Sequence, residues 1–254
     1  MKRKIETILA LKTIFDHLYT YIIPMPRINV IIPAYNEEQS IAKVVAAIPA
    51  GLADDVIVVN NNSTDHTAQQ AAQANATVLH EPRPGYGYAC LKGITYALNK
   101  PEATRPAILV FLDGDFSDYP EEMPLVLAPI LAGRAEMVIG SRTTGERESG
   151  ALLPQQLFGN WLATKLIDLF YNATFTDLGP FRAITVPALL QLNMSDGTYG
   201  WTVEMQAKAA KYKIPFVEVP VSYRKRIGVS KVSGTVKGTF MAGYKILYTI
   251  FKYS

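Results

Sequence analysis

Residues 28–59 read INVIIPAYNEEQSIAKVVAAIPAGLADDVIVV, and this stretch decides the fold. Its two ends, Ile28–Ile32 and Val56–Val59, are short continuous apolar runs, which are typical of strands buried on both faces of a sheet. The segment between them, Glu37–Ile48, has the pattern of a helix. A strand, a helix and a second strand in this order predict two parallel strands joined by a crossover helix.

The same alternation continues along the chain. Further strands are expected at residues 77–79, 107–112 and 137–139, and helices at residues 63–75, 88–98 and 121–131. Less regular segments follow, with helices expected at 155–171, 201–212 and 235–253 and extended chain at 178–184 and 214–219. An amphipathic helix is also expected at residues 5–23. The rhythm predicts an α/β fold with a mainly parallel sheet that has helices on both faces.

Composition excludes several classes of protein. Of the 254 residues, 49% are hydrophobic and 19% are charged, so the chain is globular rather than disordered. Its one cysteine, Cys90, excludes an internal disulfide framework and a cysteine-rich zinc site. The sequence has no uninterrupted run of 18 apolar residues, so no transmembrane helix is expected. The N-terminus lacks the pattern of a cleaved signal peptide.

Charge is distributed unevenly. The net charge of +3 is weak support for nucleic-acid binding, and no nucleic-acid partner is expected. From Lys211 to the end, however, nine basic residues face one acid, Glu218. This asymmetry predicts that the C-terminal part of the chain meets phosphates or an anionic surface.

Polar clusters follow three of the expected strands. They are Pro33–Glu37, Asn60–Asp65 and Asp113–Asp115. Because ligands bind at the carboxyl ends of the strands in such sheets, the three clusters are expected to form one site. The carboxylates of Asp113 and Asp115, separated by Gly114, suit a hard divalent cation that also binds substrate phosphates.

These clusters, together with Gly140-Ser141-Arg142, resemble segments of the family 2 glycosyltransferases, and the resemblance covers residues 27–233. Asp177–Arg182 is similar to the Gly-Phe-Arg segment of that family. Arg226–Lys231 resembles the Arg…Gly-x-Ser-Lys segment of the dolichyl- and polyprenyl-phosphate sugar transferases. The resemblance implies a GT-A fold, which is Rossmann-like, here flanked by amphipathic helices.

The resemblance and the amphipathic patterns near the two ends together predict a division of the chain. Residues 1–26 would form an N-terminal helix, residues 27–142 the nucleotide-sugar half and residues 143–233 the acceptor half of one domain. Residues 234–254 would form a C-terminal helix that associates with membranes.

The implied activity is transfer of a sugar, with inversion, from a UDP- or GDP-linked donor, with Mg²⁺ or Mn²⁺ as cofactor. Asp113 and Asp115 would hold the metal, with Asp113 also facing the ribose, and Tyr35 would pack on the base. The implied donor-binding residues are Pro33, Tyr35, Glu37, Asn60, Asn61, Asp113, Gly114 and Asp115. Arg182, Arg226, Ser230 and Lys231 would bind the acceptor or phosphates. Asp115, Arg142 and Glu204 would carry catalysis.

The chain departs from the family at two places. Asn60-Asn61 stands where the family has two aspartates, and an Asn side chain both accepts and donates hydrogen bonds. The choice of base is therefore open. Pro180 is inserted between Gly179 and Phe181, which affects the geometry of the acceptor loop.

Two acceptors are compatible with the sequence. A polyprenyl phosphate is favoured; it is already ionised and needs no general base. The alternative is a hydroxyl acceptor, such as a glycolipid or polysaccharide, with Glu204 as base. An ordinary ion pair between Glu204 and Lys208, four residues apart on one helix, explains Glu204 equally well. A third reading is an inactive protein that only binds nucleotide sugars, and retention of both Asp113 and Asp115 argues against it.

The final helix carries two opposed faces. Lys237, Lys245 and Lys252 share one arc; Val236, Phe240, Leu247, Ile250 and Phe251 share another. This pattern predicts a helix that lies in the membrane interface, although a helix packed on the protein core is the alternative. The expected location is the inner face of the cytoplasmic membrane, as a peripheral protein, and a homo-oligomer is compatible with the sequence.

Overall fold

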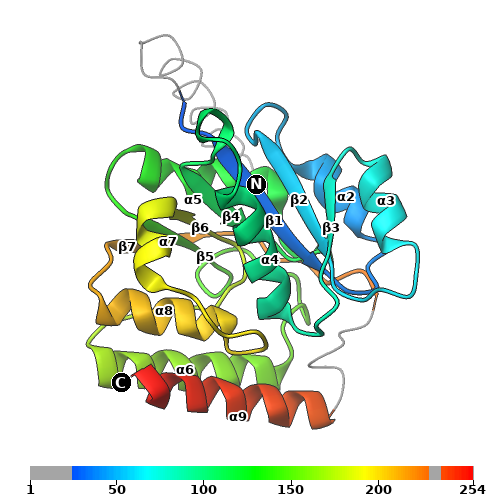
Figure 1. The fold of residues 1–254 in the computed structure, drawn as a ribbon. Helices are drawn as coiled ribbons and strands as arrows, with labels where there is room; N and C mark the ends of the chain where they lie inside the picture. The colour runs from blue at the N-terminus through cyan, green and yellow to red at the C-terminus, as the bar shows by residue number, and fades with distance from the viewer. Residues whose placement is uncertain (1–24, 229–235, 254) are drawn as a thin grey trace.

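A seven-stranded sheet forms the centre of the part that the computed structural model describes, residues 25–228 and 236–253 (Figure 1). Its strands are β1 (Ile28–Ala34), β2 (Asp55–Asn60), β3 (Thr77–His80), β4 (Ile108–Phe111), β5 (Met137–Ser141), β6 (Arg182–Thr185) and β7 (Phe216–Pro220). Their order across the sheet is β3-β2-β1-β4-β6-β5-β7. The mixed α/β fold predicted from the sequence is confirmed.

The strand order places a crevice beside β1. Strands β2 and β4 both pair with β1 in parallel, so the chain winds away from β1 in opposite directions. In open sheets of this kind, ligands bind at the carboxyl ends of the strands where the winding reverses. The loops after β1 and β4 therefore meet at the expected binding edge.

Helices cover both faces of the sheet (Figure 1). The buried core on one face includes side chains from α4 (Tyr86–Leu98), α6 (Pro154–Tyr171), α7 (Val186–Leu192), α8 (Trp201–Lys211) and α9 (Val236–Tyr253). The core on the other face includes side chains from α2 (Ile41–Ala47), α3 (Thr67–Gln73) and α5 (Met123–Leu131). Short 3₁₀ turns lie at Glu102–Thr104 and Pro120–Glu122.

The structure differs from the sequence prediction at three elements. Helix α2 begins at Ile41 rather than at Glu37, because residues 37–40 form a turn in which the Ser40 amide donates to the Glu37 carbonyl. Helix α7 was not predicted; it begins after Thr185, whose hydroxyl accepts from the Ala188 amide. Strand β6 runs antiparallel to both β4 and β5, which the apolar pattern of its residues does not reveal.

The terminal helices give a mixed outcome. The helix predicted at residues 5–23 lies outside the described residues. Helix α9 is present and packs against α6 and α8 (Figure 1). Its predicted membrane face is wrong in part, because Ile250 is fully buried in the protein core whereas Phe251 is exposed. The side chains of Val236, Lys237 and Phe240 lie outside the described part.

Within residues 25–228 and 236–253, we find no helix with both the length and the apolar character needed to cross a membrane.

Candidate active site

A cavity of about 460 Å³ opens at the carboxyl ends of β1, β2 and β4. It brings together eight of the residues singled out from the sequence, namely Pro33, Tyr35, Glu37, Asn61, Asp113, Gly114, Asp115 and Arg226. Four others, Asn60, Arg142, Arg182 and Glu204, are not part of its wall. Ser230 and Lys231 lie outside the described residues.

The loop after β4 presents Asp115 to this cavity. The Oδ1 atom of Asp115 accepts hydrogen bonds from the amide and the hydroxyl of Ser117, so this oxygen is committed to the loop itself. The other oxygen, Oδ2, lies 3.2 Å from the guanidinium of Arg226. Phe116, which follows Asp115 in the loop, has a φ of 63°, a left-handed conformation that is unusual for a bulky residue. Such strain persists only where neighbouring contacts hold it.

Those neighbouring contacts come from a segment more than a hundred residues later in the chain. Arg224 donates from Nε to the Phe116 carbonyl at 2.7 Å, and its guanidinium lies 3.4 Å from the centre of the Phe116 ring. The Ile227 amide donates to the Asp115 carbonyl at 2.9 Å. Residues 223–227, which we call the strap, are thus hydrogen-bonded along the loop after β4.

Three buried polar atoms of cavity-lining residues lack a hydrogen-bond partner among the described residues, namely Asp113 Oδ1, the hydroxyl of Tyr86 and Arg226 Nε. Burial, reinforced by the nearby charge of Asp115, raises the pKa of Asp113 to about 7. Unsatisfied buried polar groups are costly, so a ligand that bonds to them would be bound favourably. In the sequence Tyr86 stands between Gly85 and Gly87, a pattern that does not by itself reveal a binding residue.

The carboxylate oxygens of Asp113 and Asp115 suit a divalent cation that is bound by the protein and by substrate phosphates together. The described residues contain no group of three or more His, Cys, Asp or Glu side chains that could hold a metal ion. Mg²⁺ is commonly bound by one or two carboxylates together with phosphate oxygens and water. The donor set therefore suits a cation that arrives with a phosphate-bearing ligand.

The two asparagines hold the turns around the cavity. Asn61 Nδ2 donates to the carbonyls of Glu81 and Arg83 at 2.9 and 2.7 Å, and its Oδ1 accepts from the Gly85 amide at 2.8 Å. Asn60 Oδ1 accepts from the Ser63 amide. An aspartate at position 61 could not donate to the two carbonyls, so the departure from the family pattern has a local structural reason.

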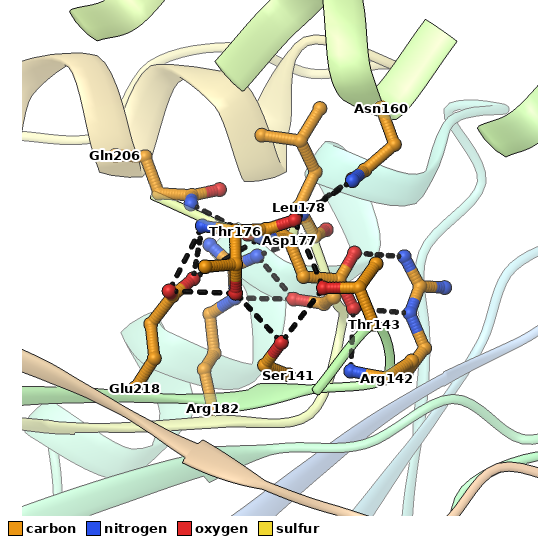
Figure 2. A network of polar contacts seen from close by, with 11 residues as sticks. Ser141, Arg142, Thr143, Asn160, Thr176, Asp177, Leu178, Arg182, Gln206 and Glu218 are labelled. Carbon is orange, nitrogen blue, oxygen red and sulfur yellow. Dashed lines mark hydrogen bonds and ion pairs between the residues drawn. The ribbon is translucent and has the colours of Figure 1, made fainter. Parts of the chain in front are cut away.

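Arg142 does not line the cavity and belongs to a network of polar contacts around Asp177 (Figure 2). Its guanidinium makes a two-bond pair with Asp177, at 2.8 Å from Nε and 2.7 Å from Nη2. Glu218 of β7 accepts from the amides of Thr176 and Asp177 and so fixes the same segment (Figure 2). The prediction that Arg142 neutralises donor phosphates is not supported, because Asp177 already neutralises its charge.

Arg182 is also a structural residue. Its side chain is fully buried and donates to the carbonyls of Leu178, Gly179 and Thr202. Burial lowers its pKa to about 10. The guanidinium thus bonds within the fold, which gives no support to the prediction that it binds the acceptor, and that role stays a prediction.

Glu204 is fully buried and does not reach the cavity. Its carboxylate pairs with Lys208 at 2.6 Å, accepts from the Ser195 and Asp196 amides, and accepts from the Tyr253 hydroxyl at 2.8 Å. The ion-pair interpretation is confirmed, although the pair is buried rather than exposed. The interpretation of Glu204 as a catalytic base gains no support from this arrangement, because the carboxylate already pairs with Lys208 and accepts hydrogen bonds from the other groups; that role stays a prediction.

Glu204 instead supports a wall of the cavity that the sequence did not reveal. The loop 195–200 contributes Thr198 and Tyr199 to the lining, and its Gly197 carbonyl accepts from the Tyr88 amide of α4. On its other side, Asp196 pairs with Lys245 of α9 at 2.9 Å. No sequence motif marks Thr198 or Tyr199, because their position depends on contacts with three separate helices.

Comparisons with known proteins agree with this geometry. The family model described as "Glycosyl transferase family 2" matches residues 29–190. An uncharacterized glycosyltransferase of Mycobacterium tuberculosis is 36% identical over 219 residues, which cover 85% of this chain and 94% of that protein. The undecaprenyl-phosphate mannosyltransferase of Micrococcus luteus is 28% identical, over 84% of this chain and 90% of its own length.

Among solved structures, glucosyl-3-phosphoglycerate synthase from Mycobacterium tuberculosis is similar, with a TM-score of 0.71. The alignment covers 90% of this chain and 80% of that one at 21% identity. That crystal contains Mn²⁺, UDP and glucosyl-3-phosphoglycerate. At this identity the likeness establishes the fold, which is that of the GT-A glycosyltransferases.

The role of Asn61 predicts unequal effects of two neighbouring substitutions. Asn61→Asp places a carboxylate against two carbonyl oxygens and is expected to lower the free energy of unfolding by about 1–3 kcal/mol. Each kcal/mol should lower Tm by roughly 2–4 °C. Asn60→Asp keeps the acceptor that Ser63 uses and makes the same charge change, so its Tm should move little. Thermal unfolding of both variants at pH 7 checks this, and equal shifts would contradict the role assigned to Asn61.

The contacts of Glu204 predict a pH-dependent loss of stability. Burial opposes its ionisation, but the hydrogen bonds from Lys208 and Asp196 outweigh burial and hold the pKa of Glu204 below its usual value. A lowered pKa stabilises the fold above the unfolded value near 4.5, and this stabilisation disappears as pH falls through the folded value. Glu204→Gln should therefore cost about 3 kcal/mol at pH 7, or roughly 6–12 °C in Tm.

The same difference between wild type and Glu204→Gln should shrink steadily below pH 4. Arg27→Gln, which breaks an exposed ion pair with Asp54, serves as the control. Its loss in free energy of unfolding should be about 0.5 kcal/mol, which changes Tm by about 2 °C or less. A Glu204→Gln variant as stable as wild type at pH 7 would show that its buried contacts are unimportant.

Proposed function

The chain belongs to glycosyl transferase family 2, and we propose that it transfers a sugar from a nucleotide diphosphate donor to a polyprenyl phosphate at a membrane surface. The observation that carries the donor part is the cavity at the strand ends, whose lining combines the carboxylates of Asp113 and Asp115 with small and aromatic residues. UDP and Mn²⁺ in the similar synthase crystal support the same donor class.

Each end of the cavity suits one part of such a donor. Tyr35 is 46% exposed at the rim, where its ring offers a stacking surface to a base. Asp113 and Tyr86 offer an unpartnered acceptor and an unpartnered hydroxyl to the ribose or sugar hydroxyls. A divalent cation held by Asp115 and Asp113 would neutralise charge on the departing diphosphate.

The reaction is an in-line displacement at the anomeric carbon. An oxygen of the acceptor phosphate forms the new bond as the bond to the donor diphosphate breaks, and the electron pair leaves with that diphosphate. No proton has to be removed from an ionised phosphate acceptor. This suits a site in which Glu204, the acid that a hydroxyl acceptor was expected to need, is fully engaged elsewhere.

The identity of the acceptor is also supported by the relatives. The Micrococcus luteus protein is named for undecaprenyl phosphate, a lipid phosphate. The synthase of similar fold is named for a small phosphorylated acid. An apolar surface on the present chain favours the lipid of these two acceptors.

That surface spans helices α6 and α9, which lie side by side (Figure 1). Its exposed side chains are Phe158, Trp161, Leu169 and Phe170 on α6 and Met241, Tyr244, Tyr248 and Phe251 on α9. Phe170 and Phe251 meet edge to face at 5.1 Å and join the two rows into one surface. We call this surface the aromatic face.

The chemistry of the aromatic face suits the membrane interface. Trp161 is 54% exposed and Leu169 is 74% exposed, and large exposed apolar side chains that gather in one patch mark sites of membrane or protein binding. Trp and Tyr rings favour the headgroup level of a bilayer. Lys165 and Lys252 are exposed on the same helices and would meet lipid phosphates. Peripheral binding to the inner face of the membrane is the location proposed here.

Membrane binding through the aromatic face predicts a selective loss on substitution. Replacing Trp161 and Tyr248 together by Ser should weaken co-sedimentation with anionic vesicles by about tenfold, because both rings lose burial at the headgroups. The control replaces Leu190 and Tyr96, exposed apolar residues on α7 and α4, by Ser and should leave binding unchanged. Equal loss in the two double variants would remove the aromatic face as the binding surface.

Activity with matched acceptors tests the proposed reaction. Purified protein is supplied with UDP- and GDP-linked sugars, Mg²⁺ or Mn²⁺, and either a polyprenyl phosphate or the polyprenol that lacks the phosphate. We expect transfer to the phosphate only. We also expect a loss of about a hundredfold or more in Asp115→Ala, because a stabiliser of transition-state charge is removed.

Two results would contradict the proposal. Equal transfer to polyprenol would favour the hydroxyl alternative. Full turnover in excess chelator would exclude a role for the metal.

A further inference from the structure

Arg226 lies between two carboxylates in the cavity wall. Its guanidinium is 2.8 Å from Glu37 Oε1 and 3.2 Å from Asp115 Oδ2. Both acids are nearly buried, with side chains 9% and 10% exposed, whereas Arg226 is 27% exposed. Among the described residues, Arg226 thus pairs with both of these acids at the point where a donor diphosphate is proposed to bind.

The oxygen that Arg226 holds is the one that a cation needs. Asp115 Oδ1 is committed to Ser117, which leaves Oδ2 as the outward oxygen of this carboxylate. Arg226 pairs with that same Oδ2. A divalent ion and the guanidinium would both be positive groups at one oxygen, and like charges at such a short separation repel each other.

The side chain of Arg226 can leave without unfolding its surroundings. The strap is held by backbone and neighbouring bonds, from Ile227 to Asp115 and from the Arg224 amide to the Ser117 carbonyl at 3.0 Å. None of these bonds involves the Arg226 guanidinium. In addition, Arg226 Nε is buried and has no hydrogen-bond partner, so the present position leaves one donor unsatisfied.

We propose that Arg226 takes the place of the divalent cation in the donor-free protein and exchanges with it when the donor binds. This inference rests on the proposed function, because it takes the donor to be a nucleoside diphosphate bound with a metal ion. On binding, the guanidinium moves from Glu37 and Asp115 to phosphate oxygens, which suit its planar set of donors. Asp115 Oδ2 would then be available to hold the cation.

The exchange has a thermodynamic consequence. The cation alone must displace Arg226 and leave it without a partner, so its affinity is low. With a nucleoside diphosphate present, the displaced guanidinium gains a new anionic partner, so the affinity for the cation rises. Coupling of this kind is reciprocal, and the cation must raise the affinity for the nucleotide by the same factor.

Titration with Mn²⁺ alone tests the exchange directly. Binding is measured through the electron paramagnetic resonance signal of free Mn²⁺, without nucleotide. We expect Arg226→Gln to bind Mn²⁺ at least about tenfold more tightly than wild type. Lys225→Gln makes the same charge change on the exposed neighbouring residue and should match wild type. Arg226→Lys keeps the charge but cannot bridge both carboxylates, so its gain in Mn²⁺ affinity over wild type should be smaller than that of Arg226→Gln.

The same titration with saturating UDP or GDP gives the second measurement. Either nucleotide that binds should tighten Mn²⁺ binding strongly in wild type and much less in Arg226→Gln. Thermal unfolding confirms that each variant is folded, and Arg226→Lys provides the comparison if the Gln variant is not.

The outcomes separate the two proposals. If Mn²⁺ binds Arg226→Gln no more tightly than wild type while nucleotide and Mn²⁺ still bind together, the exchange is overturned and the donor proposal stands. If Mn²⁺ binds wild type no better with either nucleotide, both proposals fall. Tighter binding in Lys225→Gln equal to that in Arg226→Gln would assign the effect to general charge and overturn the specific role of Arg226.

Discussion

The bonding of the strap to the loop after β4 is the constraint on which the site depends. Through it, residues near position 226 lie beside Glu37, 189 positions earlier in the chain. The same bonds hold Phe116 in a left-handed conformation, which lets Asp115 turn one carboxylate oxygen into its own loop and the other outward. Without the strap, the cavity would lose the guanidinium of Arg226, and the strained loop after β4 would lose its support.

Much of the nucleotide half could be predicted from the sequence, because its signals are local. Apolar runs mark the buried strands, and polar residues directly after a parallel strand must gather at one edge of the sheet. The charged residues of the second half could not be assigned in this way. Asp177 lies 35 positions from Arg142, and nothing in either local sequence reveals that the two pair. A motif identifies the residue type, whereas its partner decides whether the charge is available.

Glu204 illustrates the same limit in another form. Its spacing from Lys208 is typical of an exposed helical pair, yet the pair is buried and holds the loop that completes the cavity wall. The loop also joins the cavity to α9 through Asp196 and Lys245. The helix that contributes half of the aromatic face therefore contacts a loop that lines the proposed donor site. The proposed membrane surface and the proposed donor site would then lie in neighbouring parts of one fold.

The most direct measurement is a crystal structure of the protein with a nucleoside diphosphate and Mn²⁺. We expect the nucleotide in the cavity at the ends of β1 and β4, the cation between Asp115 and the phosphates, and the Arg226 guanidinium on the diphosphate rather than on Glu37. A nucleotide bound outside this cavity would contradict the central claim that these strand ends form the donor site. A cation at Asp115 with Arg226 still bridging Glu37 and Asp115 would contradict the exchange.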